Sequence, residues 1–117
     1  DTHFSQDALK EISIMESLCN NILDELIIMD YDEFKNIVDK VDIMEDNIDK
    51  TQHQFTVNQL IRLKEKKCST ENSIIYTKIL TDFERIGDHG LNIAESLYHI
   101  RKIMKQMKMI KPEIEEA

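Results

Sequence analysis

Four carboxylates, arranged in two pairs, are the residues whose types and spacing best fit a chemical role. Glu84 and Asp88 form one pair, Glu45 and Asp49 form the other, and each pair is spaced four residues apart. Residues four apart share one face of a helix, so both carboxylates of a pair point the same way. Converging carboxylates raise one another's pKa values unless a cation neutralises them. Oxygen-rich sites of this kind suit iron, manganese, magnesium or zinc.

Helices must position these pairs, because no segment shows the alternating pattern of a strand. Apolar residues recur at spacings of three and four, which predicts helices at about residues 7–29, 32–66 and 71–109. The clearest break is Cys68-Ser69-Thr70, and Pro112 introduces a loose acidic tail at 112–117. Short turns between long helices predict an all-α domain over residues 1–117, an antiparallel up-down-up three-helix bundle.

The third helix is expected to face the core through Ile86, Gly90, Ile93 and Leu97. It also contains Gly87, and each mid-helix glycine costs about 1 kcal/mol relative to alanine. Two such glycines indicate that a neighbouring backbone or side chain approaches closely.

The two carboxylate pairs are expected to line one groove between the second and third helices. If the turn is centred near Ser69, Asp49 lies opposite position 89 and Glu45 lies opposite position 93. The alternative is an ordinary solvated acidic rim, with basic side chains balancing the charge. A salt bridge from Arg85 is expected to orient a carboxylate. The residues that would extend or support the ligand set are Asp42, Arg85, Asn92 and Glu95.

Composition excludes several classes of protein. The net charge of −8 over 117 residues argues against nucleic-acid binding. No apolar run approaches the length of a membrane span. Cys19 and Cys68 are too isolated for a disulfide framework, which predicts free thiols. No nucleophile–base arrangement or phosphate-binding loop is present, so the sequence does not indicate an enzyme.

The third helix carries a specific motif. The run Phe83-Glu84-Arg85-Ile86-Gly87-Asp88-His89, followed by Asn92-Ile93-Ala94-Glu95, closely resembles the PhoU family of phosphate-uptake regulators. The resemblance implies a three-helix bundle and iron or zinc held on its surface by Glu/Asp-x-x-x-Asp motifs, with manganese or magnesium less expected. Glu84 and Asp88 match the second motif, and Glu45 and Asp49 match the first by spacing and helix position.

The resemblance also implies partners and a location. Stand-alone PhoU proteins resemble two bundles in tandem, whereas a single bundle is typical of the cytoplasmic part of bacterial sodium/phosphate cotransporter-like proteins. The start at Asp1, without an initiator Met, is consistent with a piece of a longer protein. We therefore expect a regulatory domain at the cytoplasmic face of the bacterial inner membrane. Its expected partners are a transmembrane phosphate transporter in the same polypeptide and a second copy of the domain in a homodimer. We expect the domain to contact the membrane only through the transporter.

Two alternatives remain open. One is a stand-alone regulator of a phosphate ABC transporter and its sensor kinase. The other is a purely structural helical interaction module whose acidic rim binds nothing.

Overall fold

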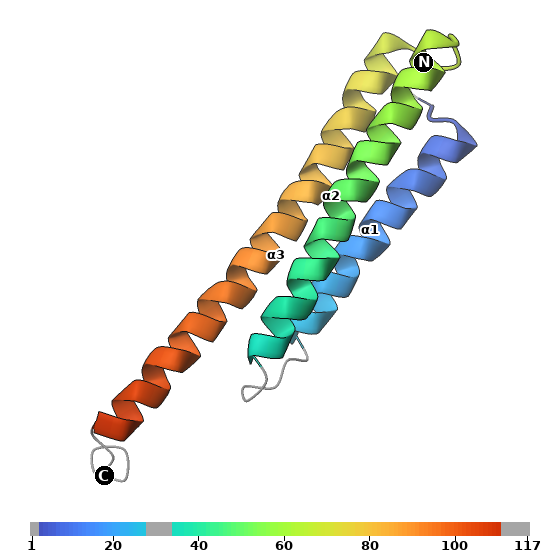
Figure 1. Cartoon of the computed structure of the whole chain (residues 1–117). Coiled ribbons are helices and arrows are strands. Elements are labelled where there is room, and N and C mark those ends of the chain that lie inside the picture. Colours follow the sequence, from blue (N-terminus) through green and yellow to red (C-terminus); the bar gives the residue numbers. More distant parts are fainter. Residues whose placement is uncertain (1–2, 28–33, 111–117) are drawn as a thin grey trace.

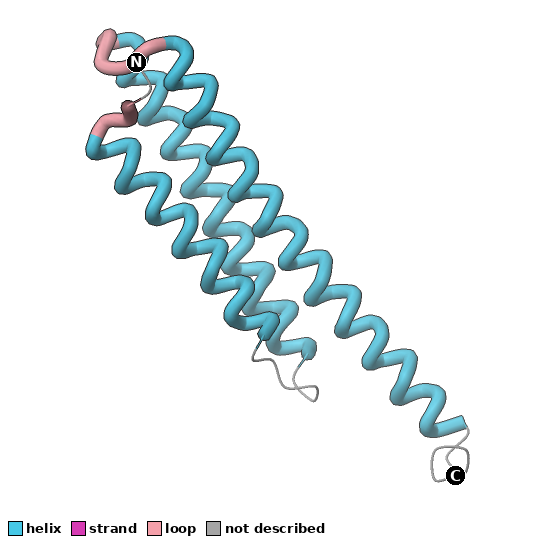
Figure 2. Tube along the Cα trace, turned by 180° about the vertical axis from the view of Figure 1, so that it is seen from behind, coloured by secondary structure: helices cyan, strands magenta, loops and turns pink. Residues whose placement is uncertain are grey.

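Three long helices contain nearly all of the described residues of the structure, a computed structural model that covers residues 3–27 and 34–110. They are α1 (Gln6–Ile27), α2 (Phe34–Lys64) and α3 (Thr70–Ile110). The helices lie side by side in an elongated bundle of 70 × 21 × 17 Å (Figures 1 and 2). No described residue is in a strand. The predicted up-down-up three-helix bundle is confirmed.

The helix limits differ slightly from the expected ones. α1 begins one residue earlier than expected, α2 ends at Lys64 rather than at 66, and α3 spans 70–110 rather than 71–109. The expected ends at 29 and 32 and the expected tail at 112–117 lie outside the described residues.

Side-chain and backbone caps define these limits. The Ser5 hydroxyl accepts a hydrogen bond from the Ala8 amide at 3.1 Å, and Ser69 accepts one from the Asn72 amide at 3.1 Å. Both are N-caps, which satisfy an amide that the first helical turn leaves free. At the end of α2, Lys66 adopts a positive φ of 59°, and the Lys67 amide donates to the Arg62 carbonyl at 2.8 Å. This is a Schellman motif with lysine at the position where glycine is preferred.

The core runs along the centre of the bundle and draws on all three helices. Its largest fully buried side chains are those of Tyr76, Met15, Ile22, Ile48, Leu80 and Val41. Cys19 is also buried and donates to the Phe83 carbonyl at 3.1 Å. Both cysteines are free thiols.

Close approach to α3 occurs at its two glycines. A Cβ at Gly90 would lie 2.5 Å from Ile22 Cγ2 of α1, and a Cβ at Gly87 would lie 3.1 Å from Ile48 Cδ1 of α2. The glycines therefore allow both neighbouring helices to pack tightly against α3, as the sequence indicated.

The core face of α3 is only partly the expected one. Gly90 is buried, but Ile86 is 39% exposed and Ile93 is 48% exposed. The prediction that these two isoleucines enter the core was wrong. The small residues Gly87, Gly90 and Ala94 occupy the closest contacts instead, which turns the isoleucines outward.

α3 is the longest helix, with 41 residues against 31 in α2 and 22 in α1. Its C-terminal end extends beyond the other two helices (Figure 1). The bundle therefore has a three-helix body and a single-helix projection.

Candidate metal centre

The two predicted carboxylate pairs meet where α2 and α3 pack together. One ligand oxygen from each of Glu45, Asp49, Glu84 and Asp88 lies within 4.8 Å of the other three. All four residues are partly buried. We call this group the carboxylate centre; it contains the same four residues that the spacing singled out.

Packing beneath the carboxylates explains how they come so close. Ile48 of α2 is fully buried, and its side chain rests against Gly87 of α3. Ile48 lies between Glu45 and Asp49 in sequence, and Gly87 lies between Glu84 and Asp88. The contact between the bulky isoleucine and the glycine thus brings both carboxylate pairs to the same level of the bundle.

The register differs from the expected one by about one helical turn. Glu45 pairs with Asp88 and not with position 93, because the turn lies between Lys64 and Thr70 and is centred before Ser69. Because of this shift, the two carboxylate pairs lie at the same level of the bundle and not on neighbouring turns.

The carboxylate centre is electrostatically strained. Partial burial, hydrogen bonds with Asp88 and Asp49, and the charges of both raise the pKa of Glu45 to about 8. Burial and the same two neighbours also raise the pKa of Glu84. At least one proton is therefore retained near neutral pH, unless a cation takes its place.

In the part of the chain that the structure describes, no ion pair with a basic side chain supplies that neutralisation. The ion pairs between described residues are Lys40–Glu25, Lys50–Asp46, Arg62–Glu11, Lys67–Glu65 and Lys78–Asp82. None involves the carboxylate centre. Arg85, which was expected to orient a carboxylate, is exposed and takes part in none of these pairs. An all-oxygen donor set without a counter-charge fits a hard divalent cation.

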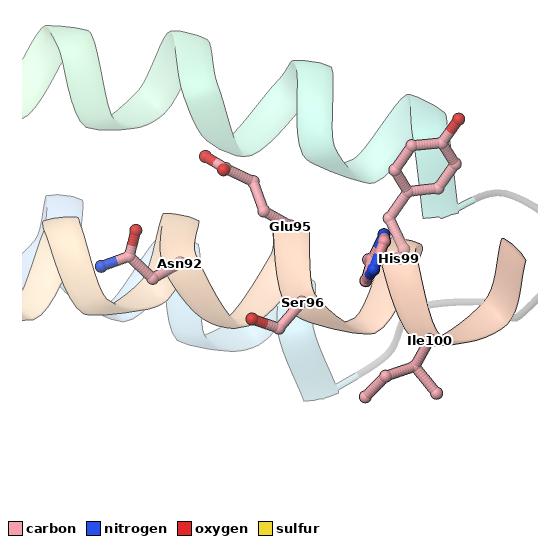
Figure 3. Close-up of a pocket in the computed structure, with 6 residues that line it drawn as sticks. Asn92, Glu95, Ser96, His99 and Ile100 are labelled. Carbon is pink, nitrogen blue, oxygen red and sulfur yellow. The ribbon is translucent and has the colours of Figure 1, made fainter. Parts of the chain in front are cut away.

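The other candidate ligands lie outside this group. Asp42, Asn92 and Glu95 are exposed, and neither Asp42 nor Glu95 is among the four clustered carboxylates. Asn92 and Glu95 border a shallow hollow on α3 together with Ser96, His99 and Ile100 (Figure 3). Figure 3 shows Glu95 directed toward α2.

A second polar group, which the sequence analysis missed, lies nearer the α2–α3 turn. The buried Glu11 carboxylate of α1 accepts hydrogen bonds from Arg62 at 2.7 Å, Tyr76 at 2.5 Å and Asn58 at 2.8 Å. Burial alone would raise the pKa of Glu11, but these hydrogen bonds and the charge of Arg62 outweigh it, and the pKa is lowered. This network joins all three helices.

Further contacts of Arg62 extend the Glu11 network. The Arg62 guanidinium lies 5.3 Å from the centroid of the Tyr76 ring, a cation–π arrangement, and its Nε donates to Gln59 at 2.8 Å. Gln59 in turn donates to Ser73 at 2.9 Å. The signal in the sequence was the position of Glu11, which shares the apolar face of Ala8 and Met15, where a carboxylate needs buried partners.

Comparison with known proteins identifies the family. The sequence matches the PhoU domain over residues 12–97. The chain belongs to the PhoU domain family. The matched region contains all four residues of the carboxylate centre. No curated protein and no solved structure gives a significant match.

Family membership indicates the general role. PhoU domains are regulatory, non-enzymatic helical domains that act in phosphate homeostasis through interactions with phosphate transport components. None of the helices in the described parts of this PhoU domain combines the length and apolar character needed to cross a membrane.

Proposed function

We propose that this PhoU domain regulates phosphate transport and that the carboxylate centre binds a divalent cation. The family supports the regulatory role. The observation that supports a bound cation is the convergence of Glu45, Asp49, Glu84 and Asp88 within 4.8 Å, with no ion pair to a basic side chain among the described residues. A bound cation offsets the burial and the repulsion that raise the pKa of Glu45 and Glu84, and it joins α2 to α3.

Iron or zinc is the proposed metal, with manganese and magnesium as the weaker candidates. The carboxylates supply only oxygen ligands, which all four metals accept. The resemblance of the Glu84–Asp88 segment to the metal-binding motif of the family favours iron or zinc.

The metal proposal is tested by elemental mass spectrometry of the purified chain, with and without reloading. The Glu84→Gln/Asp88→Asn double variant removes two charges while preserving side-chain shape. The matched control is Asp39→Asn/Asp46→Asn, which removes two exposed carboxylates of α2 outside the centre. We expect stoichiometric metal in the wild type and the control and its loss in the first variant. Metal that persists in the first variant contradicts the assignment.

The finer proposal concerns the partner. We infer that the domain acts on a sodium-dependent phosphate transporter at the cytoplasmic face of a bacterial inner membrane, as part of the same polypeptide. Support comes from the likeness of a single bundle to the cytoplasmic part of such proteins. The rival is a stand-alone regulator of a phosphate ABC transporter and its sensor kinase. The reading frame that precedes Asp1 separates them, because only the first requires membrane spans there.

Regulation itself is tested by phosphate uptake in cells. Uptake by the intact protein is compared with that of the Glu84→Gln/Asp88→Asn variant and the Asp39→Asn/Asp46→Asn control. We expect a changed uptake rate or phosphate set point in the first variant only. Equal uptake by all three proteins, at equal protein levels, would show that the carboxylate centre takes no part in regulation.

A further inference from the structure

A row of apolar side chains runs along α3 at strict seven-residue intervals. It consists of Ile79, Ile86, Ile93, Ile100 and Met107, and we call it the isoleucine stripe. Ile79 is partly buried, whereas Ile86, Ile93, Ile100 and Met107 are 39%, 48%, 51% and 60% exposed. The core of this bundle does not use these four exposed side chains, so their spacing requires another explanation.

A seven-residue apolar repeat is the pattern of a helix that packs lengthwise against another helix. The stripe spans 28 residues, or about 42 Å at 1.5 Å per residue. It begins within the three-helix body and continues onto the single-helix projection (Figure 1). The occupant that fits this face is therefore one long helix.

The symmetry of the stripe indicates what that helix is. The five positions are centred on Ile93, so an antiparallel copy of α3 would place Ile93 against Ile93. Ile86 would then meet Ile100, and Ile79 would meet Met107. All five positions pair in a single register.

The charge distribution along α3 favours the same orientation. Residues 70–97 contain five acidic and two basic residues, whereas residues 98–110 contain four basic residues and none that are acidic. An antiparallel partner lays the basic end of each α3 along the acidic part of the other. A parallel partner would bring like charges together.

The area of the face is sufficient for a specific dimer. Two further side chains, those of Ile103 and Met104, are 42% and 46% exposed on the projection. Together with Ile86, Ile93, Ile100 and Met107 they expose on the order of 500 Å² in each copy. Pairing two copies removes on the order of 1,000 Å², which reaches the size of a small specific interface.

We propose that the isoleucine stripe is a homodimer interface in which two α3 helices pack antiparallel about Ile93. The surface lies on α3 and the metal proposal is not needed for it. In the dimer, the projecting end of each α3 is covered by the body of the other copy.

Sedimentation velocity of the chain between about 1 and 100 µM tests the dimer. Ile93→Asp places two carboxylates together at the twofold axis and is expected to give a monomer. Ile43→Asp makes the same change at an isoleucine of α2 that is 71% exposed, and it is expected to leave the dimer intact. Circular dichroism confirms that both variants retain their helices. A monomeric wild type, or equal dissociation of both variants, overturns the proposal.

Cysteine cross-linking tests the orientation in a Cys68→Ser background. An antiparallel pair gives a disulfide in Ile93→Cys alone and in a mixture of Ile86→Cys with Ile100→Cys. Efficient self-linking of Ile86→Cys overturns the antiparallel arrangement. Flotation with phosphatidylglycerol vesicles tests another occupant, because the stripe ends in a basic segment. A monomer that floats with these vesicles assigns the face to a membrane surface and overturns the dimer.

Discussion

Gly90 and Gly87 provide a matched pair of substitutions that tests how closely α3 packs against its neighbours. Changing either glycine to alanine gains about 1 kcal/mol of helix propensity. The two sites differ in what the new methyl group meets. At Gly90 it would lie 2.5 Å from Ile22 Cγ2, and at Gly87 it would lie 3.1 Å from Ile48 Cδ1.

The steric cost should therefore be much larger at Gly90. Normal contacts between carbons are about 3.5–4.0 Å, so the Gly90 contact is short by about 1 Å. Cγ2 is attached directly to Cβ of the fully buried, β-branched Ile22, whose χ1 angle is stiff. Overpacking of this kind costs about 2–3 kcal/mol, which leaves a net loss of about 1–2 kcal/mol for Gly90→Ala.

Gly87→Ala should instead be neutral or stabilising by up to about 1 kcal/mol. Ile48 Cδ1 is the end of a flexible side chain and needs to move by only a few tenths of an ångström. The helix-propensity gain therefore survives at this site.

Urea denaturation followed by circular dichroism measures both free energies of unfolding. Ile22→Leu removes the Cγ2 branch and should reduce the cost of Gly90→Ala, as a double-mutant cycle would show. If Gly90→Ala is as stable as Gly87→Ala, α1 does not approach α3 as described. No rescue by Ile22→Leu would also refute the steric argument.

Two further predictions concern stability. Glu11→Gln leaves the largely buried Arg62 without its anionic partner and should lower the free energy of unfolding by about 3 kcal/mol. The control Asp82→Asn breaks the exposed pair with Lys78 and should change the free energy of unfolding by less than about 0.5 kcal/mol. Because the pKa of Glu11 is lower in the folded state than its ordinary value of 4.5, the contribution of Glu11 to stability is present above about pH 4.5 and is lost as the pH falls through the folded pKa. The difference in the free energy of unfolding between the wild type and Glu11→Gln should therefore shrink in acid, and a constant difference would contradict this. Lys66→Gly relieves the positive φ of 59° and should raise stability by about 0.5–1 kcal/mol in thermal unfolding, whereas Lys67→Gly should give no gain.

The fold and the carboxylate centre were readable from the sequence because both depend on helical periodicity. Three long amphipathic segments with one clear break leave few arrangements, and carboxylates four residues apart must share a face. The exact register was not readable, because it depends on where the turn begins. The Schellman motif at Lys66 ends α2 two residues early and moves Glu45 opposite Asp88.

The orientation of α3 was the principal error, and it has a physical reason. Apolar residues cover nearly half the circumference of this helix, so periodicity alone does not decide which of two adjoining stripes is buried. Close packing selected the stripe that contains Gly87, Gly90 and Ala94, since small residues allow two helices to approach. The larger Ile86 and Ile93 were left outside.

The buried network of Glu11 was not predicted, because the pattern of apolar residues gives no information about a single carboxylate on an apolar helix face. Its partners Asn58, Arg62 and Tyr76 come from the other two helices, 47 to 65 residues away in sequence. Only the three-dimensional register brings them together. Interactions of this kind are fixed by tertiary packing and not by any local pattern.

The most direct test of the metal proposal is anomalous X-ray diffraction from crystals of the chain soaked in zinc. We expect an anomalous peak between Glu45, Asp49, Glu84 and Asp88, about 2.0–2.2 Å from at least three of their oxygens. The peak should be absent from crystals of the Glu84→Gln/Asp88→Asn variant. Well-ordered crystals that show no peak among these four carboxylates, or that bind zinc only elsewhere, would contradict the central claim.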